Sequence, residues 1–201
     1  MFTVFLVDDE PAVVKAMSRL LRTNGYDVRA YTSPQDFLAT HDAAAPGCAI
    51  FDVSMPGLNG LELQEAITTG GFGRPVIFMT GKGDIPTSVR AMKAGAIDFL
   101  TKPVSDREIF AAIARAEKQD ADARQLQAEK TSIQAKIATL TPREQQVMTH
   151  VVAGRLNKQI AGDLGTVEKT IKVHRSRMLG KLGTRTVADL VRMVGKIGLS
   201  R

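Results

Sequence analysis

Five side chains suited to phosphoryl transfer or metal binding lie at the ends of short apolar runs in the first half of the chain. Asp8 and Asp9 come directly after one run, and Asp52 ends another. Thr80 and Lys102 lie at the ends of two later runs. Crowded carboxylates repel one another unless a cation compensates, and Mg²⁺ prefers carboxylate oxygens and water. With Mg²⁺ bound, one carboxylate can attack a phosphoryl donor while the lysine neutralises the phosphoryl oxygens.

Each of these features also has an ordinary structural explanation. Acids that precede a helix often serve as N-terminal charge caps, and Asp8 and Asp9 fit that role as well. Asp52 stands before a Pro-Gly loop, where a carboxylate commonly stabilises a turn. The order and spacing of all five residues are more specific than any one of them.

Short apolar runs alternate with amphipathic segments over residues 1–120. Strands are predicted at Thr3–Val7, Val28–Tyr31, Cys48–Asp52, Val76–Met79 and Asp98–Thr101. Helices are predicted at Pro11–Asn24, Pro34–Thr40, Leu61–Thr68, Ile85–Ala94 and Asp106–Lys118. This alternation favours an α/β fold with a five-stranded, doubly wound parallel sheet. In a flavodoxin-like strand order of 2-1-3-4-5, the carboxyl ends of the first, third and fifth strands lie near one another, so the acids and the lysine would meet.

The composition is that of an ordinary globular protein. The chain has 201 residues, of which 44% are hydrophobic and 24% charged. No apolar run approaches the roughly 18 residues that span a bilayer, and the N-terminus lacks a signal-peptide pattern, so we expect a cytoplasmic protein without a membrane partner. The single cysteine, Cys48, excludes an intramolecular disulfide and is best explained as a small core residue.

The two parts of the chain carry opposite charge. Residues 1–120 contain 12 Lys and Arg against 15 Asp and Glu, a net charge of −3, whereas residues 121–201 contain 15 against 6, a net charge of +9. A small basic domain beside a mildly acidic one indicates a polyanionic partner for the second part, although a merely solubilising surface gives the same balance.

A helical linker is predicted over residues 121–140, between one domain at 1–120 and another at 141–201. No Gly or Pro occurs from Val104 to Thr141, so the fifth helix is expected to continue into this linker. Its apolar residues recur at sevens and at threes or fours: Leu126, Ile133, Ile137 and Leu140. This spacing fits a coiled-coil seam between protomers, and an isolated solvated helix fits it equally well.

Residues 141–201 are predicted to form four short helices in an all-α domain. A helix after Thr141 runs towards Gly154, Asn157 caps the helix Lys158–Leu164, and the helices Glu168–Leu182 and Thr186–Val194 follow. The short second helix, the Gly-containing turn and the longer basic third helix make a helix-turn-helix arrangement.

The third helix has two distinct faces. Ile171, Met178 and Leu182 share one face, suited to a core. The opposite face, expected in the major groove, carries Lys169, Lys172, Val173 and Ser176, with Lys172 suited to a guanine edge and Val173 to a thymine methyl group. Phosphate contacts are predicted for Lys158, Thr170, His174, Arg175 and Lys181, and His174 fits a buried structural role equally well.

Residues 1–120 resemble the receiver domain of a two-component response regulator, through VFLVDDEP, FDVSMPGLNG and IFMTGKGDIPTSVRAMKAGAIDFLTKP. The last segment is especially similar to the FixJ branch. The resemblance implies that Asp52 is the phosphoacceptor and that Asp8, Asp9, Asp52 and the backbone carbonyl of Ser54 hold Mg²⁺.

The same resemblance assigns the remaining residues of the receiver site. It implies that Thr80 and Lys102 contact the phosphoryl group and that the Lys102–Pro103 peptide bond is cis. Phe99 falls at the aromatic switch position of the family, although a plain core residue is the alternative. Ser54 is smaller than the residues usual at its position, which leaves the lifetime of the phosphorylated state open.

The C-terminal part resembles the DNA-binding domain of the LuxR/NarL type, through TPREQQVMTHVVAGRLNKQIAGDLG and EKTIKVHRSRMLGKLG. Thr166 and Val167 depart from the family, which usually has an apolar residue and then a Ser cap at the start of the third helix. Val is a poor N-cap, worth about 1 kcal/mol less than Ser.

Together the two resemblances imply a transcriptional regulator of the FixJ/NarL type and not an enzyme. The expected partners are a histidine kinase, double-stranded promoter DNA and RNA polymerase. Phosphorylation of Asp52 would rearrange Thr80 and Phe99 and reshape the face formed by Ile85–Ala94 and the fifth strand. That face would then form a homodimer or release the DNA-binding domain. The alternatives are a Mg²⁺-dependent aspartyl-phosphate phosphatase or phosphotransferase with a nucleic-acid tether, and a regulator that binds DNA without phosphorylation.

Overall fold

The computed structural model describes residues 1–70 and 73–198. The chain divides into two compact units, Met1–Ala123 and Arg124–Arg201. Helix α5 (Asp106–Ala138) is one long helix, as the sequence predicted from the lack of Gly and Pro. The boundary between the two units falls within it. Among the described residues, no helix has both the length and the apolar character needed to cross a membrane.

The first unit is built on a five-stranded parallel sheet in the order β2-β1-β3-β4-β5, which confirms the predicted α/β fold. Its strands are β1 (Thr3–Val7), β2 (Asp27–Tyr31), β3 (Gly47–Asp52), β4 (Val76–Thr80) and β5 (Asp98–Thr101). Val7 pairs with Phe51, and Thr80 pairs with Thr101. The polar residues at the strand ends therefore come to one edge of the sheet.

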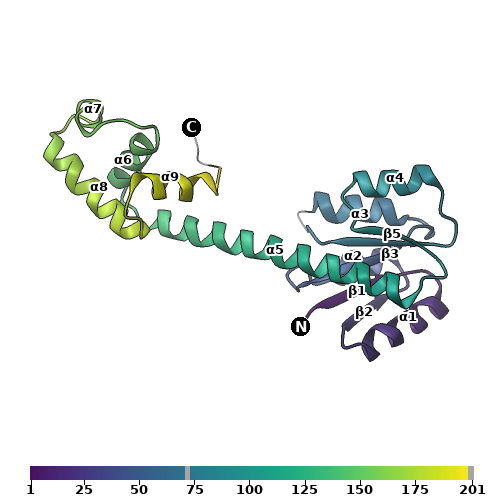
Figure 1. Cartoon of the computed structure of the whole chain (residues 1–201). Coiled ribbons are helices and arrows are strands. Elements are labelled where there is room, and N and C mark those ends of the chain that lie inside the picture. The colour runs from purple at the N-terminus through teal and green to yellow at the C-terminus, as the bar shows by residue number, and fades with distance from the viewer. Residues whose placement is uncertain (71–72, 199–201) are drawn as a thin grey trace. The chain divides into compact units, whose positions relative to one another are not determined.

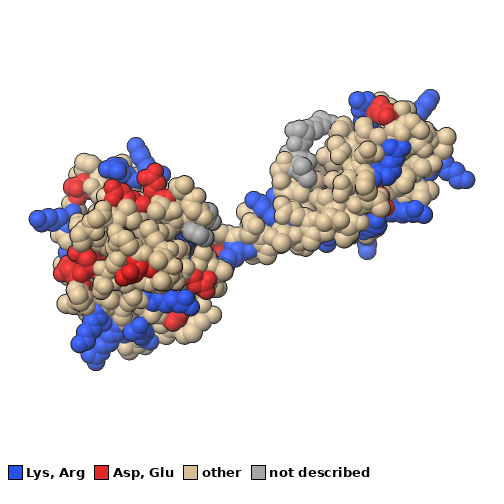
Figure 2. Space-filling model, turned by 180° about the vertical axis from the view of Figure 1, so that it is seen from behind, with Lys and Arg blue, Asp and Glu red and all other residues tan. Residues whose placement is uncertain are grey.

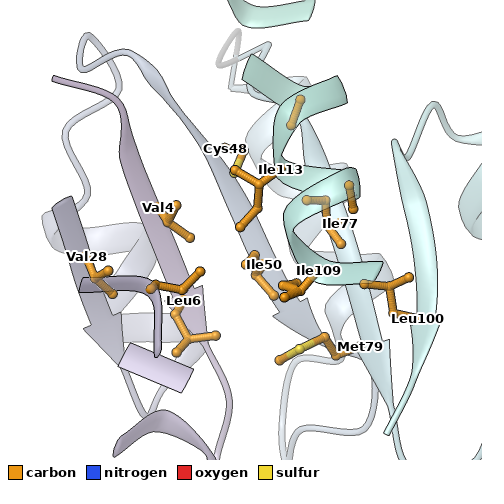
Figure 3. Close-up of a cluster of buried hydrophobic side chains, with 13 residues drawn as sticks. Val4, Leu6, Val28, Cys48, Ile50, Ile77, Met79, Leu100, Ile109 and Ile113 are labelled. Carbon is orange, nitrogen blue, oxygen red and sulfur yellow. The ribbon is translucent and has the colours of Figure 1, made fainter. Parts of the chain in front are cut away.

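Helices cover both faces of this sheet (Figure 1). They are α1 (Pro11–Thr23), α2 (Pro34–Thr40), α3 (Gly60–Thr69), α4 (Ile85–Lys93) and the first part of α5. One apolar cluster packs Leu21 of α1 and Ile109 and Ile113 of α5 against the strands (Figure 3). The other cluster, around Phe37 and Leu63, packs α2, α3 and α4 against the opposite face.

Side-chain caps begin four of these helices, and the one before α5 is formed by Ser105 and Glu108. Ser33 accepts from the backbone N–H of Asp36 before α2, Asn59 forms a capping box before α3, and Asp84 accepts from the N–H of Thr87 before α4. The cap of Asp84 fixes where α4 begins, directly after the segment that leaves the polar edge of the sheet.

The second unit packs the end of α5 with four helices: α6 (Pro142–Val152), α7 (Asn157–Asp163), α8 (Glu168–Leu182) and α9 (Val187–Gly195). Leu140 lies in its apolar core with Ile171 and Met178, and the half-buried Ile137 packs against this core. Ile133 is also buried, whereas Leu126 is exposed. Three of the four residues of the predicted coiled-coil seam are therefore buried or half-buried within a single chain.

One predicted cap is wrong. Asn157 is the first residue of α7 and not its cap, which is Leu156. The Asn157 side chain instead accepts a hydrogen bond from Arg175, while the backbone N–H of Leu156 donates to Gln159. A side chain engaged by another helix cannot serve as the cap of its own.

Candidate functional site

Lys102 joins the two buried carboxylates at the polar edge of the sheet. Its Nζ lies 2.7 Å from Asp8 Oδ2 and 2.6 Å from Asp52 Oδ1. Asp8 follows β1, Asp52 ends β3 and Lys102 follows β5, so three strands of the sheet supply one site. The peptide bond between Lys102 and Pro103 is cis, as the resemblance implied. The fold thus brings together three of the predicted residues.

Backbone donors hold both carboxylates from the other side. Asp8 Oδ1 accepts from the N–H of Glu10 at 3.0 Å, and Asp52 Oδ2 accepts from the N–H of Ser54 at 2.6 Å. Burial raises the pKa of Asp8, although the hydrogen bonds from Lys102 and from the Glu10 N–H oppose the rise. Burial lowers the pKa of Lys102, but its hydrogen bonds to Asp52 and Asp8 outweigh this effect and the pKa is raised. Lys102 is therefore a charged ammonium that compensates two buried acids.

Thr80 and Phe99 both lie next to Gly83, in the loop after β4. The Thr80 hydroxyl donates to the backbone carbonyl of Lys82 at 3.1 Å and accepts from the N–H of the same residue at 3.2 Å. A Cβ placed on Gly83 would lie 3.6 Å from Thr80 Cγ2 and 3.7 Å from Phe99 Cε1. The half-buried ring of Phe99 also contacts Phe78, with centroids 6.3 Å apart. Thr80, Phe99 and Gly83 therefore share one environment at the loop after β4.

Two of the residues expected to bind Mg²⁺, Asp8 and Asp52, already lie close together. Asp8 and Asp52 are hard oxygen donors that already face one cation, the Lys102 ammonium, so their chemistry fits Mg²⁺. Asp9 is half-buried beside Asp8, and Ser54 is exposed two residues after Asp52. Within residues 1–70 and 73–198, no three His, Cys, Asp or Glu side chains form a ready-made metal cluster.

Helix α8 presents a polar face and a buried face. Ile171, Met178 and Leu182 are buried in the unit, as the sequence predicted. The exposed residues of the helix include Lys169, Lys172, Val173, Ser176 and Arg177. In the view of Figure 2, blue basic side chains are more prominent than red acidic ones on this unit, whereas red and blue patches both occur on the first unit.

Two of the residues predicted to contact phosphates, Lys181 and Arg175, make hydrogen bonds to other residues of the same unit. Lys181 lies 2.6 Å from the Glu144 carboxylate and donates to the carbonyl of Thr139 at 3.2 Å. Arg175 donates to Asn157 Oδ1 at 2.9 Å. Lys181 and Arg175 therefore also join helices within the unit, a structural role that the sequence did not indicate.

Comparisons with known proteins match the two parts of the chain to two different domain families. The model of the response regulator receiver domain matches residues 4–114, and the model of the bacterial regulatory proteins of the luxR family matches residues 138–194. The chain belongs to the response regulator family. It is 39% identical to nodulation protein W of Bradyrhizobium diazoefficiens over 98% of this chain and 87% of that protein, and 36% identical to the transcriptional regulatory protein FixJ of the same organism over 98% and 96%.

The solved structure of response regulator StyR is similar over nearly the whole length. Its TM-score is 0.83 at 42% identity, covering 96% of this chain and 98% of that one. This response regulator thus has a receiver domain and a LuxR-type DNA-binding domain, and its relatives are transcriptional regulators. A receiver domain implies a histidine kinase partner, and this family generally depends on Mg²⁺ for phosphorylation.

Sequence reasoning missed two residues on the polar face of α8. Arg177 is exposed one turn after Val173, and the same helical spacing that selected Val173 would have found it. Glu168 pairs with Lys172 at 3.2 Å. A search for four-residue spacing between opposite charges would have revealed that pair.

Proposed function

We propose that this response regulator accepts a phosphoryl group on Asp52 from a histidine kinase and thereby controls its own binding to promoter DNA. The observation that carries the proposal is the Lys102 ammonium, which lies within 2.7 Å of Asp8 and Asp52. A lysine that already neutralises the acceptor carboxylate can move to a phosphoryl oxygen when charge develops there. The chain would be a phosphoacceptor with slow self-phosphorylation and self-dephosphorylation.

The chemistry of the site follows from its own residues. An oxygen of Asp52 forms the new bond to phosphorus, and the phosphorus–nitrogen bond to the kinase histidine breaks, with the bonding electrons leaving on the imidazole. Asp8, Asp9, Asp52 and the carbonyl of Ser54 would hold Mg²⁺, which when bound supplies positive charge for the phosphoryl oxygens. The N–H of Ser54 already fixes one oxygen of Asp52 at 2.6 Å, which orients the carboxylate.

We further propose that Thr80 and Phe99 pass the signal to α4 and β5. A phosphoryl oxygen would compete with the Lys82 backbone for the Thr80 hydroxyl, which frees the loop before α4. Helix α4 carries an apolar stripe at four- and three-residue spacing, in which Ile85 is 79%, Val89 44% and Met92 47% exposed. Such a stripe supports dimerisation through the face of α4 and β5.

For DNA, we propose that α8 enters the major groove. Lys172 would meet a guanine edge, Val173 a thymine methyl group, and Ser176 either kind of base, because all three are exposed. Lys169 lies on the same exposed side. Phosphate contacts are proposed for Lys158, Thr170, His174, Arg175, Arg177 and Lys181. RNA polymerase would be the next partner at the promoter, in the cytoplasm.

The test compares the full chain with Asp52→Asn in light scattering and in fluorescence anisotropy on promoter DNA, with and without beryllofluoride and Mg²⁺. We expect the reagents to double the molar mass and tighten DNA binding in the wild type only. An unchanged mass and affinity in the wild type would refute phosphoryl control. Continuous release of phosphate from a phosphomonoester would instead support the enzyme alternative.

A further inference from the structure

The start of α8 contains an acid at a position where a DNA-binding helix should avoid one. Glu168 is the first residue of the helix and its only acid, beside Lys169, Lys172, Arg175, Arg177 and Lys181. Phosphate groups repel a carboxylate on a surface that approaches DNA, so Glu168 weakens the general attraction of α8 for any duplex. A benefit must offset this loss if the residue contributes to binding.

Glu168 is close to the residue that we propose to contact guanine. Its carboxylate lies 3.2 Å from Lys172 Nζ, four residues along the helix, and both side chains are exposed, at 46% and 64%. Val173 and Ser176 lie on the same exposed side of α8. The acid is thus at the edge of the base-reading surface.

Two physical effects follow from this pair. Lysine has a flexible stem with several rotatable bonds, and a nearby carboxylate restricts where the ammonium can lie. A carboxylate can only accept hydrogen bonds, so the amino group of cytosine or adenine suits it and the acceptor edges of guanine and thymine repel it. While they are paired, the two side chains present a donor next to an acceptor on the exposed side of α8.

We propose that Glu168 is a specificity-determining residue that positions Lys172 on a guanine and selects a base with an amino group in the adjacent pair. The proposal rests on the proposed DNA-reading function of α8. In this role Glu168 lowers affinity for all DNA but lowers it least for the preferred sequence. Glu168 thus improves discrimination between DNA sequences and lowers the affinity for DNA.

A purely structural role for Glu168 makes a different prediction. Val167 is the N-cap of α8 and makes no side-chain cap hydrogen bond, so an acid in the first turn favours the helix through its dipole. Removal of the acid would then lower the unfolding temperature and change binding to every duplex by the same factor. Base preference separates the two roles.

The experiment uses the full chain with beryllofluoride and Mg²⁺ and a pool of duplexes with randomised sequence. A duplex selected from the pool by the wild type, its single-base variants and unselected duplex are then titrated by anisotropy at several salt concentrations. The variants are Glu168→Gln, Lys172→Met and both together. Asp163→Asn removes the same charge from the exposed end of α7 and is the matched control.

We expect Glu168→Gln to tighten binding to unselected duplex about threefold to tenfold, with a much smaller gain for the selected duplex. The ratio of the two affinities should fall, chiefly at the bases that Lys172 contacts. In the Lys172→Met background, the same change should leave this ratio unaltered, and Asp163→Asn should preserve it.

Two results would overturn the proposal. One is an equal change in affinity for all duplexes, together with a lower unfolding temperature. The other is an undiminished loss of discrimination when Lys172 is absent, since Glu168 would then act without its partner. If the wild type itself binds selected and unselected duplexes equally, the DNA-reading function fails, and this outcome is visible before any variant is made.

Discussion

Lys102 compensates the charges of two buried acids, so its removal should destabilise the receiver domain. Asp8 and Asp52 are both buried, and each lies within 2.7 Å of the Lys102 ammonium. Lys102→Met leaves two uncompensated carboxylates close together, so we expect the receiver domain to lose about 3 kcal/mol of unfolding free energy. Added Mg²⁺ should restore part of that loss, because a hard cation replaces the ammonium.

Urea unfolding followed by circular dichroism, with and without Mg²⁺, measures this effect. Lys82→Met removes an exposed charge from the adjacent loop and should change stability little. A Lys102→Met protein as stable as the wild type without Mg²⁺ would show that the acids do not need the ammonium.

Glu144 predicts a dependence of stability on pH in the DNA-binding domain. Its hydrogen bonds with Lys181 and with the Thr141 N–H lower its pKa from 4.5 to about 2. A carboxyl whose pKa is lower in the folded state stabilises that state above pH 4.5 and loses this contribution as the pH falls towards 2. We therefore expect Glu144→Gln to unfold at a lower temperature than the wild type at pH 7.

The difference between Glu144→Gln and the wild type should shrink steadily as the pH falls below about 4.5. Thermal unfolding at a series of pH values measures it. Glu129→Gln alters an exposed glutamate of the same unit that pairs with Lys196, and it is the control. A difference that stays constant down to the lowest pH would mean that the Lys181 contact does not stabilise the fold.

The chain sequence was informative about residues at strand ends and much less so about residues that contact another helix. Asp8, Asp52 and Lys102 could be predicted to meet because parallel strands end at one edge of a sheet. The contact between Lys181 and Glu144 depends on how α6 packs against α8. A local sequence pattern does not predict such packing. Asn157 misled for the same reason, since Arg175 takes its side chain.

At the scale of elements, α8 begins without a side-chain cap. Val167 is the N-cap residue, is 65% exposed and makes no cap hydrogen bond. Val167→Ser would supply a side-chain oxygen that can accept from a backbone N–H of the first turn, so we expect the DNA-binding domain to gain about 1 kcal/mol of unfolding free energy.

Thermal unfolding of the full chain measures this gain in the transition of the DNA-binding domain. Val191→Ser makes the same replacement at an exposed position within α9, where no cap is needed, and should not stabilise the protein. Equal effects of the two replacements would show that the start of α8 gains nothing from a serine.

Element type was predictable throughout, whereas some boundaries and contacts were not. Pro and Gly marked most helix starts and stops, and strands β1 and β5 begin and end where the sequence predicted. The linker residues were ambiguous because seven-residue spacing suits both a partner helix and a core. Leu140 lies in the core of the second unit and Ile137 packs against it, and that packing appears only when distant helices are folded together.

At the scale of the whole molecule, two exposed apolar surfaces are candidates for the proposed dimer interface. One is the exposed stripe Ile85, Val89 and Met92 on α4. The other is the linker around Leu126, whose companions Ile133 and Leu140 are already buried within one chain. A single exposed leucine offers far less apolar surface than three side chains on one helix face, so α4 is favoured.

Substitution of Val89 decides between these surfaces. Val89→Asp places a charge in the centre of the α4 stripe, and burial of an unpaired charge is costly, so we expect the mass doubling with beryllofluoride and Mg²⁺ to disappear. Leu126→Asp should leave the dimer intact, and Leu38→Asp, at an exposed leucine of α2, controls for added charge. Light scattering measures all three. Loss of the dimer in Leu126→Asp with retention in Val89→Asp would move the interface to the linker, because the charge must then be buried there instead.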